Sequence, residues 1–312
     1  MTAPAEDVAK MIFYQTALYF EAVPAIERYG LSCVYRKGGL SVFAEKKTGT
    51  GVPEDMRGAA AVAVTGTGSY AAAAGVSFAL GMLRAGEGDI FVNYGAAGAS
   101  RESGLKVGET VRCIKVVREG ERALYPDVLL GSGFANAAAF CVNGAAAQFV
   151  KRDGELPVVF DNESYGALFA AMKVLGPEAC FSLKTVTDFA EDTALKGGRI
   201  DPGAAAEIIK ASAGDVFDAA GKWAEEISAA SLKSRDSFRF GAEVSRAIDE
   251  LSAALKLTFA NREILKNTVR HDVLLGMDDA DLLTSLVPAP EAVPADRHGR
   301  EKLFAEILGK LG

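Results

Sequence analysis

The sequence predicts an α/β fold whose sheet is covered by helices on both faces. Short, continuously apolar runs alternate with alanine-rich segments of helical character. Uninterrupted apolar strands of this kind belong to sheets that are buried on both sides. The chain has 312 residues, of which 49% are hydrophobic and 24% charged, so it can bury a large core as one domain or as a domain with an appendage.

The predicted elements follow one another over the first 190 residues. Strands are expected at 11–18, 60–66, 89–99, 156–161 and 180–188, with helices at 21–30, 69–86 and 163–176. The segment 107–120 adds a longer strand, which we expect to curl the sheet toward a barrel. In such sheets ligands bind at the carboxyl ends of the strands. Polar residues and glycines gather there in this sequence, at Glu21, 65–68, 93–98, 161–163 and Asp188.

After about residue 200 the pattern becomes helical. Asp201 is a candidate helix cap, and Pro202 suits the first helical position. Apolar spacing predicts another helix over 243–257, then an extended linker over 286–296 and a short last helix over 301–312. We therefore divide the chain into a main domain, 1–231, and a helical C-terminal extension, 232–312.

Composition and charge argue against several classes of function. The net charge of −7 and the pI of about 5.1 leave no basic field for a phosphate backbone, so we expect no nucleic-acid partner. No apolar run reaches the ~18 residues that a membrane span needs, and the first residues lack the pattern of a signal peptide. We expect no membrane partner and a cytoplasmic location.

Cysteine and histidine narrow the chemistry further. The four cysteines, Cys33, Cys113, Cys141 and Cys180, are widely spaced in apolar surroundings, which predicts buried free thiols and no metal site. The only histidines, His271 and His298, lie in the last quarter of the chain. A Ser-His-Asp triad or a histidine-rich zinc site in the main domain is therefore not expected, and acid–base chemistry there must use carboxylates.

A glycine motif follows the second apolar strand. Gly66, Gly68 and Ala71 match a dinucleotide-binding pattern, which also needs an acidic residue at the end of the next strand. That strand ends in Asn93 and Tyr94, so a nicotinamide cofactor is disfavoured. Two interpretations remain open: a turn that directs backbone N–H groups toward a ligand, or close packing of helix on strand.

Acidic residues stand at the ends of two further strands. Asp161 and Glu163 flank Asn162 at the start of a helix, and Asp188 ends the next strand. Taken singly, acids at a helix start indicate capping and compensation of the helix dipole.

Taken together, five segments resemble the nucleoside phosphorylase and nucleosidase superfamily in order and approximate spacing. Within it the chain is most similar to the 5′-methylthioadenosine/S-adenosylhomocysteine nucleosidases. The segments are 17–24, 62–68, 92–99, 161–176 and 183–192, within a resemblance that covers roughly 11–230. The resemblance implies a three-layer α/β/α sandwich around a mixed, partly barrel-like sheet, a homodimer, and a catalytic role for the main domain, with the C-terminal extension outside the minimal enzyme.

The resemblance also implies roles for three carboxylates. Asp188 matches the aspartate that protonates N7 of the departing purine, which leaves poorly as an anion; a carboxyl shielded from water can carry that proton near neutral pH. Glu163 matches the glutamate that binds the ribose hydroxyls while positive charge grows at the anomeric carbon. Glu21 matches the residue that orients and deprotonates the attacking water.

Other positions complete the predicted purine-nucleoside site, for which we expect neither a metal nor an organic cofactor. Phe140 matches an aromatic residue that stacks on the purine, with simple core packing as the equal alternative. Asn162 replaces the usual methionine and predicts a more polar pocket. The predicted substrate-binding residues are Glu163, Asn162, Phe140, Thr65, Gly66, Gly95 and Ala96.

Two other functions stay open. A phosphorylase of the same fold binds phosphate through cationic side chains, yet Asn93 stands where the adenosine-cleaving phosphorylases have an arginine, and the next arginine is Arg101. This favours water as the nucleophile. A nucleoside-binding protein without turnover would not need a proton donor and a water activator together.

Overall fold

The computed structural model describes residues 10–45, 58–127, 130–142, 152–153, 156–195, 201–237, 241–258, 261–262, 264–266, 268–269 and 280–311. The chain divides into two compact units, Met1–Lys233 and Ser234–Gly312. This division lies close to the predicted boundary, although the separate roles assigned to the two parts stay predictions. Across the part of the chain that the structure describes, no helix has both the length and the apolar character needed to cross a membrane.

One mixed sheet organises the first unit. Its ten strands run in the order β2-β3-β4-β1-β5-β10-β6-β7-β9-β8, and an additional pairing between β5 and β9 closes five of them into a ring. The strands are β1 Ile12–Thr16, β2 Ser32–Lys37, β3 Leu40–Ala44, β4 Ala60–Val64, β5 Ile90–Ala99, β6 Thr110–Val117, β7 Ala135–Cys141, β8 Arg152–Asp153, β9 Leu156–Asp161 and β10 Cys180–Phe189. The predicted barrel-like curvature is confirmed, and the strand at 107–120 is part of the ring as β6.

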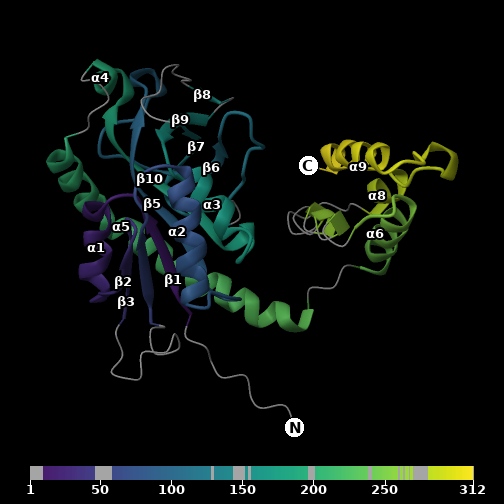
Figure 1. Ribbon diagram of the computed structural model, residues 1–312, viewed down its shortest axis with the longest axis horizontal. Helices are drawn as coiled ribbons and strands as arrows, with labels where there is room; N and C mark the ends of the chain where they lie inside the picture. The colour runs from purple at the N-terminus through teal and green to yellow at the C-terminus, as the bar shows by residue number, and fades with distance from the viewer. Residues whose placement is uncertain are drawn as a thin grey trace, which may run out of the picture. The chain divides into compact units, whose positions relative to one another are not determined.

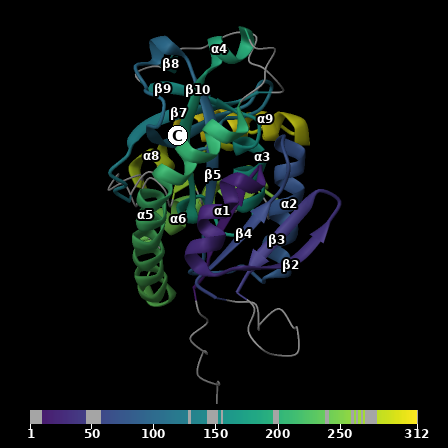
Figure 2. The same cartoon turned by 90° about the vertical axis from the view of Figure 1, so that its left-hand side faces the viewer.

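Helices cover both faces of the sheet, which confirms the three-layer prediction (Figures 1 and 2). On one face lie α1 Tyr19–Tyr29 and α5 Pro202–Ser237, and on the other lie α2 Ser69–Met82 and α3 Ser164–Ala171. Alternate residues of each strand serve the two faces: Phe13 packs with α2, whereas Tyr14 packs with α5. The short helix α4 Ala190–Leu195 follows β10.

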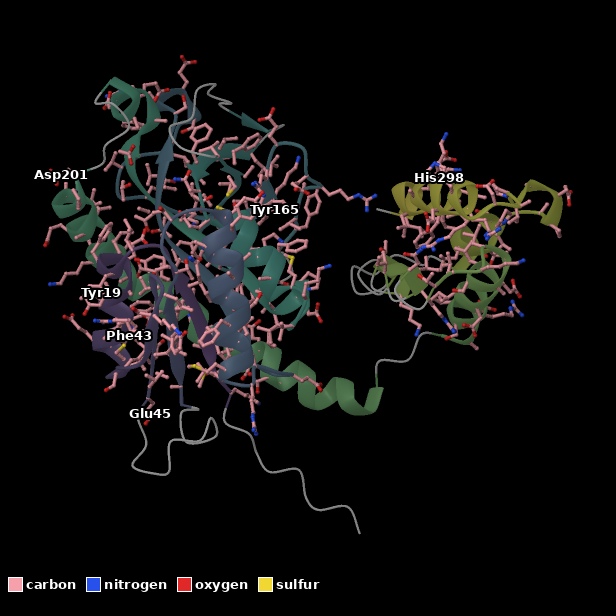
Figure 3. All side chains as sticks on the ribbon, in the orientation of Figure 1. Tyr19, Phe43, Glu45, Tyr165, Asp201 and His298 are labelled. Carbon is pink, nitrogen blue, oxygen red and sulfur yellow. The ribbon has the colours of Figure 1, made fainter. Side chains whose placement is uncertain are left out.

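Local signals explain where the helices begin. Asp201, labelled in Figure 3, accepts hydrogen bonds from the backbone N–H groups of Gly203 and Ala204 at 2.9 and 3.3 Å, so the predicted cap and the start at Pro202 are confirmed.

The helices α2 and α3 approach each other closely at Gly166, where an added Cβ would lie 1.8 Å from the Ser69 carbonyl oxygen.

Three features of the first unit differ from or extend the predictions. The hairpin β2–β3 and the strand β7 form where no strand was predicted. Cys113, Cys141 and Cys180 are buried free thiols as expected, but the prediction is wrong for Cys33, which is exposed on the edge strand β2. An edge strand has one paired neighbour, so its side chains are less completely covered.

The second unit is helical and has its own apolar core. It contains α6 Ala242–Ala254, α8 Ala280–Ser285 and α9 Arg297–Leu311, together with short 3₁₀ turns such as Pro290–Ala292. The apolar positions predicted for 243–257 are buried at Val244, Ile248 and Leu251, which pack with Phe304 and Ile307. The last helix begins earlier than predicted. His298 lies in this unit on α9 (Figure 3), whereas His271 lies outside the described residues.

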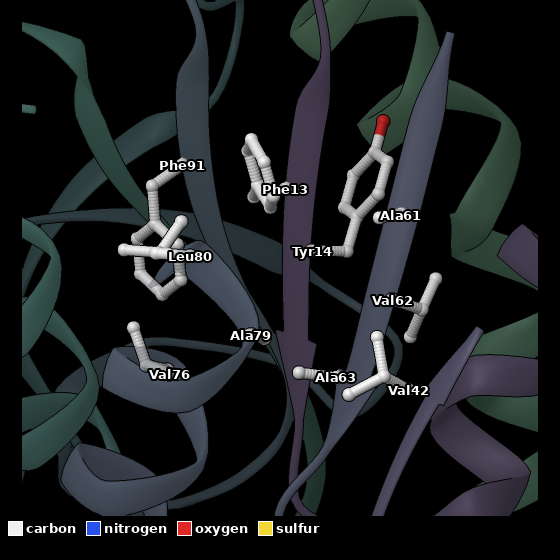
Figure 4. Close-up of a pocket in the computed structure, with 10 residues that line it drawn as sticks. All are labelled: Phe13, Tyr14, Val42, Ala61, Val62, Ala63, Val76, Ala79, Leu80 and Phe91. Atoms are coloured by element: carbon white, nitrogen blue, oxygen red, sulfur yellow. The ribbon is translucent and has the colours of Figure 1, made fainter. Parts of the chain in front are cut away.

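A small void lies in the apolar half of the main sheet (Figure 4). Its volume is about 10 Å³, and ten side chains line it: Phe13, Tyr14, Val42, Ala61, Val62, Ala63, Val76, Ala79, Leu80 and Phe91. Such a volume holds at most a single water, and this lining offers almost no polar partner for one. The void is therefore a packing feature of the core and not a ligand site.

Candidate active site

The carboxyl ends of β1, β9 and β10 lie near one stretch of β5, Gly95–Gly98. Along β10, Lys184 pairs with Gly95 and Asp188 with Gly98, across a β-bulge between Val186 and Asp188. Gly98 also pairs with Phe160 of β9, three residues before Glu163. The register of the closed ring thus brings acids from distant parts of the sequence to the same place.

Glu21 lies at the start of α1 with its carboxylate turned into this stretch. One oxygen, Oε1, accepts a hydrogen bond from the Ala96 N–H at 2.9 Å, and Oε2 accepts from the N–H groups of Ala17 and Leu18 at 2.9 and 2.7 Å. A Cβ added at Gly95 would lie 2.7 Å from Oε1, so this close approach requires glycine. Burial raises the pKa of Glu21, while the three N–H donors and Lys184 oppose that rise.

Glu163 is buried at the start of α3 and faces the glycine turn after β4. Its Oε1 accepts a 2.7 Å hydrogen bond from the Gly68 N–H. Burial raises the pKa of Glu163 from 4.5 to about 7; Asp161 and Glu21 add to the rise, and Lys184 and the Gly68 N–H oppose it.

Asp161 caps α3 and holds Lys184. Its Oδ2 accepts from the Ser164 N–H at 2.9 Å and lies 2.8 Å from Lys184 Nζ. Both side chains are almost fully buried, with exposed fractions of 1% for Asp161 and 2% for Lys184. Burial alone would lower the pKa of Lys184, but Asp161, Glu163 and Glu21 together raise it above its ordinary value. The Lys184 ammonium is therefore stabilised by three buried carboxylates.

Asp188 is half-buried at the end of β10. Its Oδ1 accepts a 2.9 Å hydrogen bond from the Thr187 hydroxyl, and its Oδ2 would lie 3.6 Å from a Cβ at Gly98. The two acids that come next in the sequence have other partners. Glu191 accepts a hydrogen bond from the Ser100 hydroxyl, and Asp192 forms a 2.6 Å ion pair with Arg101.

A hydrogen-bonded network of buried amides and hydroxyls connects Gln15 to the Asp161–Lys184 pair. The Gln15 amide donates to Thr65 Oγ1 at 2.9 Å and accepts from the Asn93 amide at 2.5 Å. Asn93 Oδ1 in turn lies 2.9 Å from the hydroxyls of both Ser164 and Ser182, and Ser164 Oγ also lies 2.5 Å from Asp161 Oδ2. The network joins four strands and the start of α3 to the Asp161–Lys184 pair, and its satisfied polar groups fix those elements relative to one another.

Two other predicted binding residues, Thr65 and Gly66, form hydrogen bonds with neighbouring protein groups. Gly66 donates its N–H to the Ala17 carbonyl at 3.0 Å, and the Thr65 hydroxyl is engaged with Gln15, so both face protein groups. The Gly68 N–H likewise meets Glu163. A Cβ added at Gly66 or Gly68 would meet nothing within 4 Å, so close packing does not explain these two glycines; both have a positive φ, 78° and 99°, which favours glycine in the turn. All these assignments as substrate-binding residues stay predictions.

Phe140 and Asn162 lie at the rim of the cluster. Phe140, on β7, is half-buried and packs against a small apolar cluster that contains Phe160; Ala190, two residues after Asp188, packs against the same cluster. Asn162 is also half-buried, and its carbonyl accepts a 3.2 Å hydrogen bond from the Ser69 hydroxyl. Both side chains therefore belong to elements that border the three acids.

Candidate metal ligands do not cluster in the part of the chain that the structure describes, since no group of three or more His, Cys, Asp or Glu residues there could hold a metal ion. The acids of the site instead face Lys184 and backbone N–H groups. Both oxygens of Glu21, for example, accept hydrogen bonds from backbone N–H groups.

Comparison with solved structures establishes the fold. A crystal structure of an MTA/SAH nucleosidase aligns with a TM-score of 0.50 at 15% identity, over 70% of this chain and 96% of that one. Native futalosine hydrolase of Helicobacter pylori strain 26695 aligns with a TM-score of 0.51 at 14% identity, over 69% of this chain and 98% of the other. The chain has the nucleoside phosphorylase/nucleosidase fold. No protein-family profile matches the sequence, and no curated protein matches it.

The nucleosidase fold confirms the resemblance seen in the sequence at the level of architecture. Two features of the site went unnoticed in the sequence. One is Lys184, a charged residue inside the apolar run 180–186, whose position was itself a signal of a buried partner. The other is the link from Gln15 through Asn93 to Ser164, which joins residues far apart in the sequence and had no local signal.

Proposed function

We propose that the protein is an N-ribosyl hydrolase that cleaves the N-glycosidic bond of a purine nucleoside with water. Asp188 donates a proton to the departing purine, and Glu21 takes a proton from the attacking water. Glu163 binds the ribose hydroxyls and stabilises the positive charge that develops at the anomeric carbon. The products are the free base and the free sugar. The carboxylate pair follows the general logic of glycoside hydrolysis, an acid at the leaving group and an anion near the sugar.

One observation carries the proposal: three carboxylates from different elements border the same stretch of β5. Glu21 receives a hydrogen bond from Ala96, Asp188 pairs with Gly98, and Glu163 follows the strand that pairs with Gly98 from the other side. The fold adds support, since an MTA/SAH nucleosidase and a futalosine hydrolase are among the solved structures that share it.

The charges around the site favour water over phosphate as the nucleophile. A phosphate site needs cationic side chains that are free to contact the anion. Asn93 is buried, with 1% exposed, and its amide is bound to Gln15. Arg101 pairs with Asp192 and lies 4.7 Å from the centre of the Phe189 ring, while Lys184 is held by Asp161.

A nucleoside panel tests the proposal. Adenosine, 5′-methylthioadenosine, inosine and a pyrimidine nucleoside are incubated with the full chain, with and without phosphate, and free base is measured by chromatography. We expect release of a purine base, with an adenosine-like substrate as the best, at a rate independent of phosphate. Release only with phosphate would establish a phosphorylase, and ligand-dependent thermal stabilisation without any release would establish a nucleoside-binding protein.

The assembly and the location also stay proposals. We propose a homodimer in the cytoplasm, in line with the resemblance of the sequence. Sedimentation of the full chain tests the first part, and a monomer at micromolar concentration would contradict it.

A further inference from the structure

Two acids, Glu191 and Asp192, follow Asp188 on the short helix α4 (Figure 1), and the proposed reaction uses neither of them. The strand pairing of β10 with β5 ends at Phe189, one residue after the predicted proton donor. Beyond that point side-chain contacts, and not the sheet, must hold the chain against β5. The position of the Asp188 carboxyl therefore depends on those contacts.

Glu191 binds the turn that follows β5 through both of its carboxylate oxygens. Its Oε1 accepts a 2.7 Å hydrogen bond from the Ser100 hydroxyl, and both oxygens lie 3.3 Å from the backbone nitrogen of Arg101. Ser100 is fully buried, with 0% exposed, and its hydroxyl oxygen also accepts a 3.3 Å hydrogen bond from the Glu102 N–H. Hydrogen bonds to an ionised group are about twice as strong as those between neutral groups, so this contact is a firm one.

Asp192 makes a weaker kind of contact with the same turn. It forms a 2.6 Å ion pair with the guanidinium of Arg101, in which the side chain of Arg101 is 57% exposed and that of Asp192 is 42% exposed. The guanidinium also lies 4.7 Å from the centre of the Phe189 ring, so a second group holds it in place. Ion pairs this exposed contribute little, because water and salt screen them. The contact of Glu191 with buried Ser100 is therefore the one that we expect to fix the turn.

The start of α4 lies close to the Asp188 carboxyl. A Cβ added at Gly98 would lie 3.6 Å from Asp188 Oδ2 and 3.8 Å from the Cβ of Ala190, the residue just before Glu191. The same point of β5 is thus bordered by the carboxyl of Asp188 and by the first residue of α4. A movement of α4 away from β5 would displace both.

We propose that Glu191 is a positioning residue, which ties the start of α4 to Ser100 and Arg101 and thereby holds the Asp188 carboxyl at the end of β5. This inference rests on the proposed function for its effect on catalysis, because a general acid must stand within hydrogen-bond reach of the atom that it protonates. A misplacement of about 1 Å can cost about a hundredfold in rate. The attachment of α4 to β5 itself does not depend on the reaction.

Substitutions of the two neighbouring acids in the full-length protein test the inference. Glu191→Ala removes the contacts with Ser100 and Arg101. We expect kcat for base release, per folded molecule, to fall about tenfold and KM to change less than about twofold, because the misplaced acid acts in the transition state. Asp192→Ala is the matched control, since it removes the next acid of the same turn, and it retains the parent kcat. Glu191→Gln keeps an oxygen that can accept from the Ser100 hydroxyl, so it recovers most of the lost rate.

The Asp188→Asn background separates positioning from a general effect on the fold. If Glu191 acts through Asp188, then Glu191→Ala causes no further loss of rate in a protein that already carries Asp188→Asn. A merely structural role would lower the rate in both backgrounds. A further loss of about tenfold in the Asp188→Asn background, or a parent-like kcat for Glu191→Ala alone, overturns the inference.

Amide hydrogen exchange separates the inference from the proposed function. In Glu191→Ala we expect peptides that cover 188–192 to exchange faster than in the parent, and in Asp192→Ala to exchange at the parent rate, because exchange reports local opening. Unchanged exchange in Glu191→Ala overturns the anchoring role, whatever the reaction. If the parent releases no base, the proposed function fails, and the exchange measurement alone decides whether Glu191 anchors α4.

Discussion

The two ends of the central strands are equally buried but held together differently. In the amino-terminal halves of β1, β5 and β10, residues such as Phe13, Phe91 and Phe181 pack between helices and make apolar contacts only. Farther along the same strands, Gln15, Asn93 and Lys184 are just as inaccessible, and each has a hydrogen-bonded or ionic partner. A buried polar group is costly unless it is paired. One sheet therefore contains an apolar region and, farther along the same strands, a region of buried and paired polar side chains.

Asp188→Asn is expected to have the largest effect of the four substitutions, and it acts on the rate of base release. The amide cannot donate an acidic proton to the departing base, so we expect the rate of base release to fall about 10³-fold, within the range for loss of a general acid. Asp192→Asn is the control, since Asp192 lies four residues on and pairs with Arg101; it retains the parent rate. Equal rates for Asp188→Asn and the parent would remove the acid role from Asp188.

Leu80→Ala tests the apolar region. Leu80 has 1% of its surface exposed and lines the existing void (Figure 4), so truncation enlarges a space that the surrounding strands cannot fill. We expect a loss of about 4 kcal/mol in the free energy of unfolding, measured by urea denaturation, with the rate per folded molecule unchanged. A large loss of rate in the folded variant would show that the two regions are not separable.

Glu163→Gln tests the raised pKa of this buried carboxyl through the pH dependence of stability. Because the folded-state pKa of Glu163 is raised to about 7 from 4.5, ionisation of this carboxyl costs the folded protein stability as the pH rises from about 4.5 through 7. At about 1.4 kcal/mol per unit, the glutamine variant gains about 3 kcal/mol relative to the parent between pH 4.5 and pH 8. Urea denaturation at both pH values measures this gain, and a difference independent of pH would contradict the raised pKa.

Gly95→Ala is expected to have the smallest effect of the four. The new Cβ would lie 2.7 Å from Glu21 Oε1, so the carboxylate must move, and we expect about a tenfold loss of rate from its displacement. Gly81→Ala is the matched control, because its Cβ meets nothing within 4 Å on the exposed side of α2. A parent-like rate for Gly95→Ala would show that the position of Glu21 is not limiting.

Sequence patterns predicted the apolar region well, because each of its elements carries a local signal. The continuous apolar runs at β1, β4 and β5 and the cap at Asp201 are properties of neighbouring residues. The strand β7 escaped prediction because its composition, Ala-Asn-Ala-Ala-Ala-Phe-Cys, favours a helix; pairing with β6 and β9 in the closed ring overrides that propensity.

The candidate site was predicted as a site shared by three acids through the resemblance, and not from local sequence patterns. Glu21, Glu163 and Asp188 were recognised from their places at the ends of strands and from the resemblance, but sequence spacing carries no information on the pairing of Gly98 with both β9 and β10. The surroundings of Lys184 were also hidden, since they depend on burial and on partners far away in the sequence, such as Asp161. Tertiary contacts, and not local pattern, create this part of the molecule.

The origin of the oxygen in the sugar product distinguishes hydrolysis from phosphorolysis. The full chain is incubated with its best purine nucleoside in H₂¹⁸O that also contains phosphate, and the sugar is analysed by mass spectrometry. Hydrolysis by the three carboxylates predicts free ribose, or its 5′-substituted form, with one ¹⁸O at the anomeric carbon. A sugar 1-phosphate without the label, or an intact nucleoside, would contradict the account.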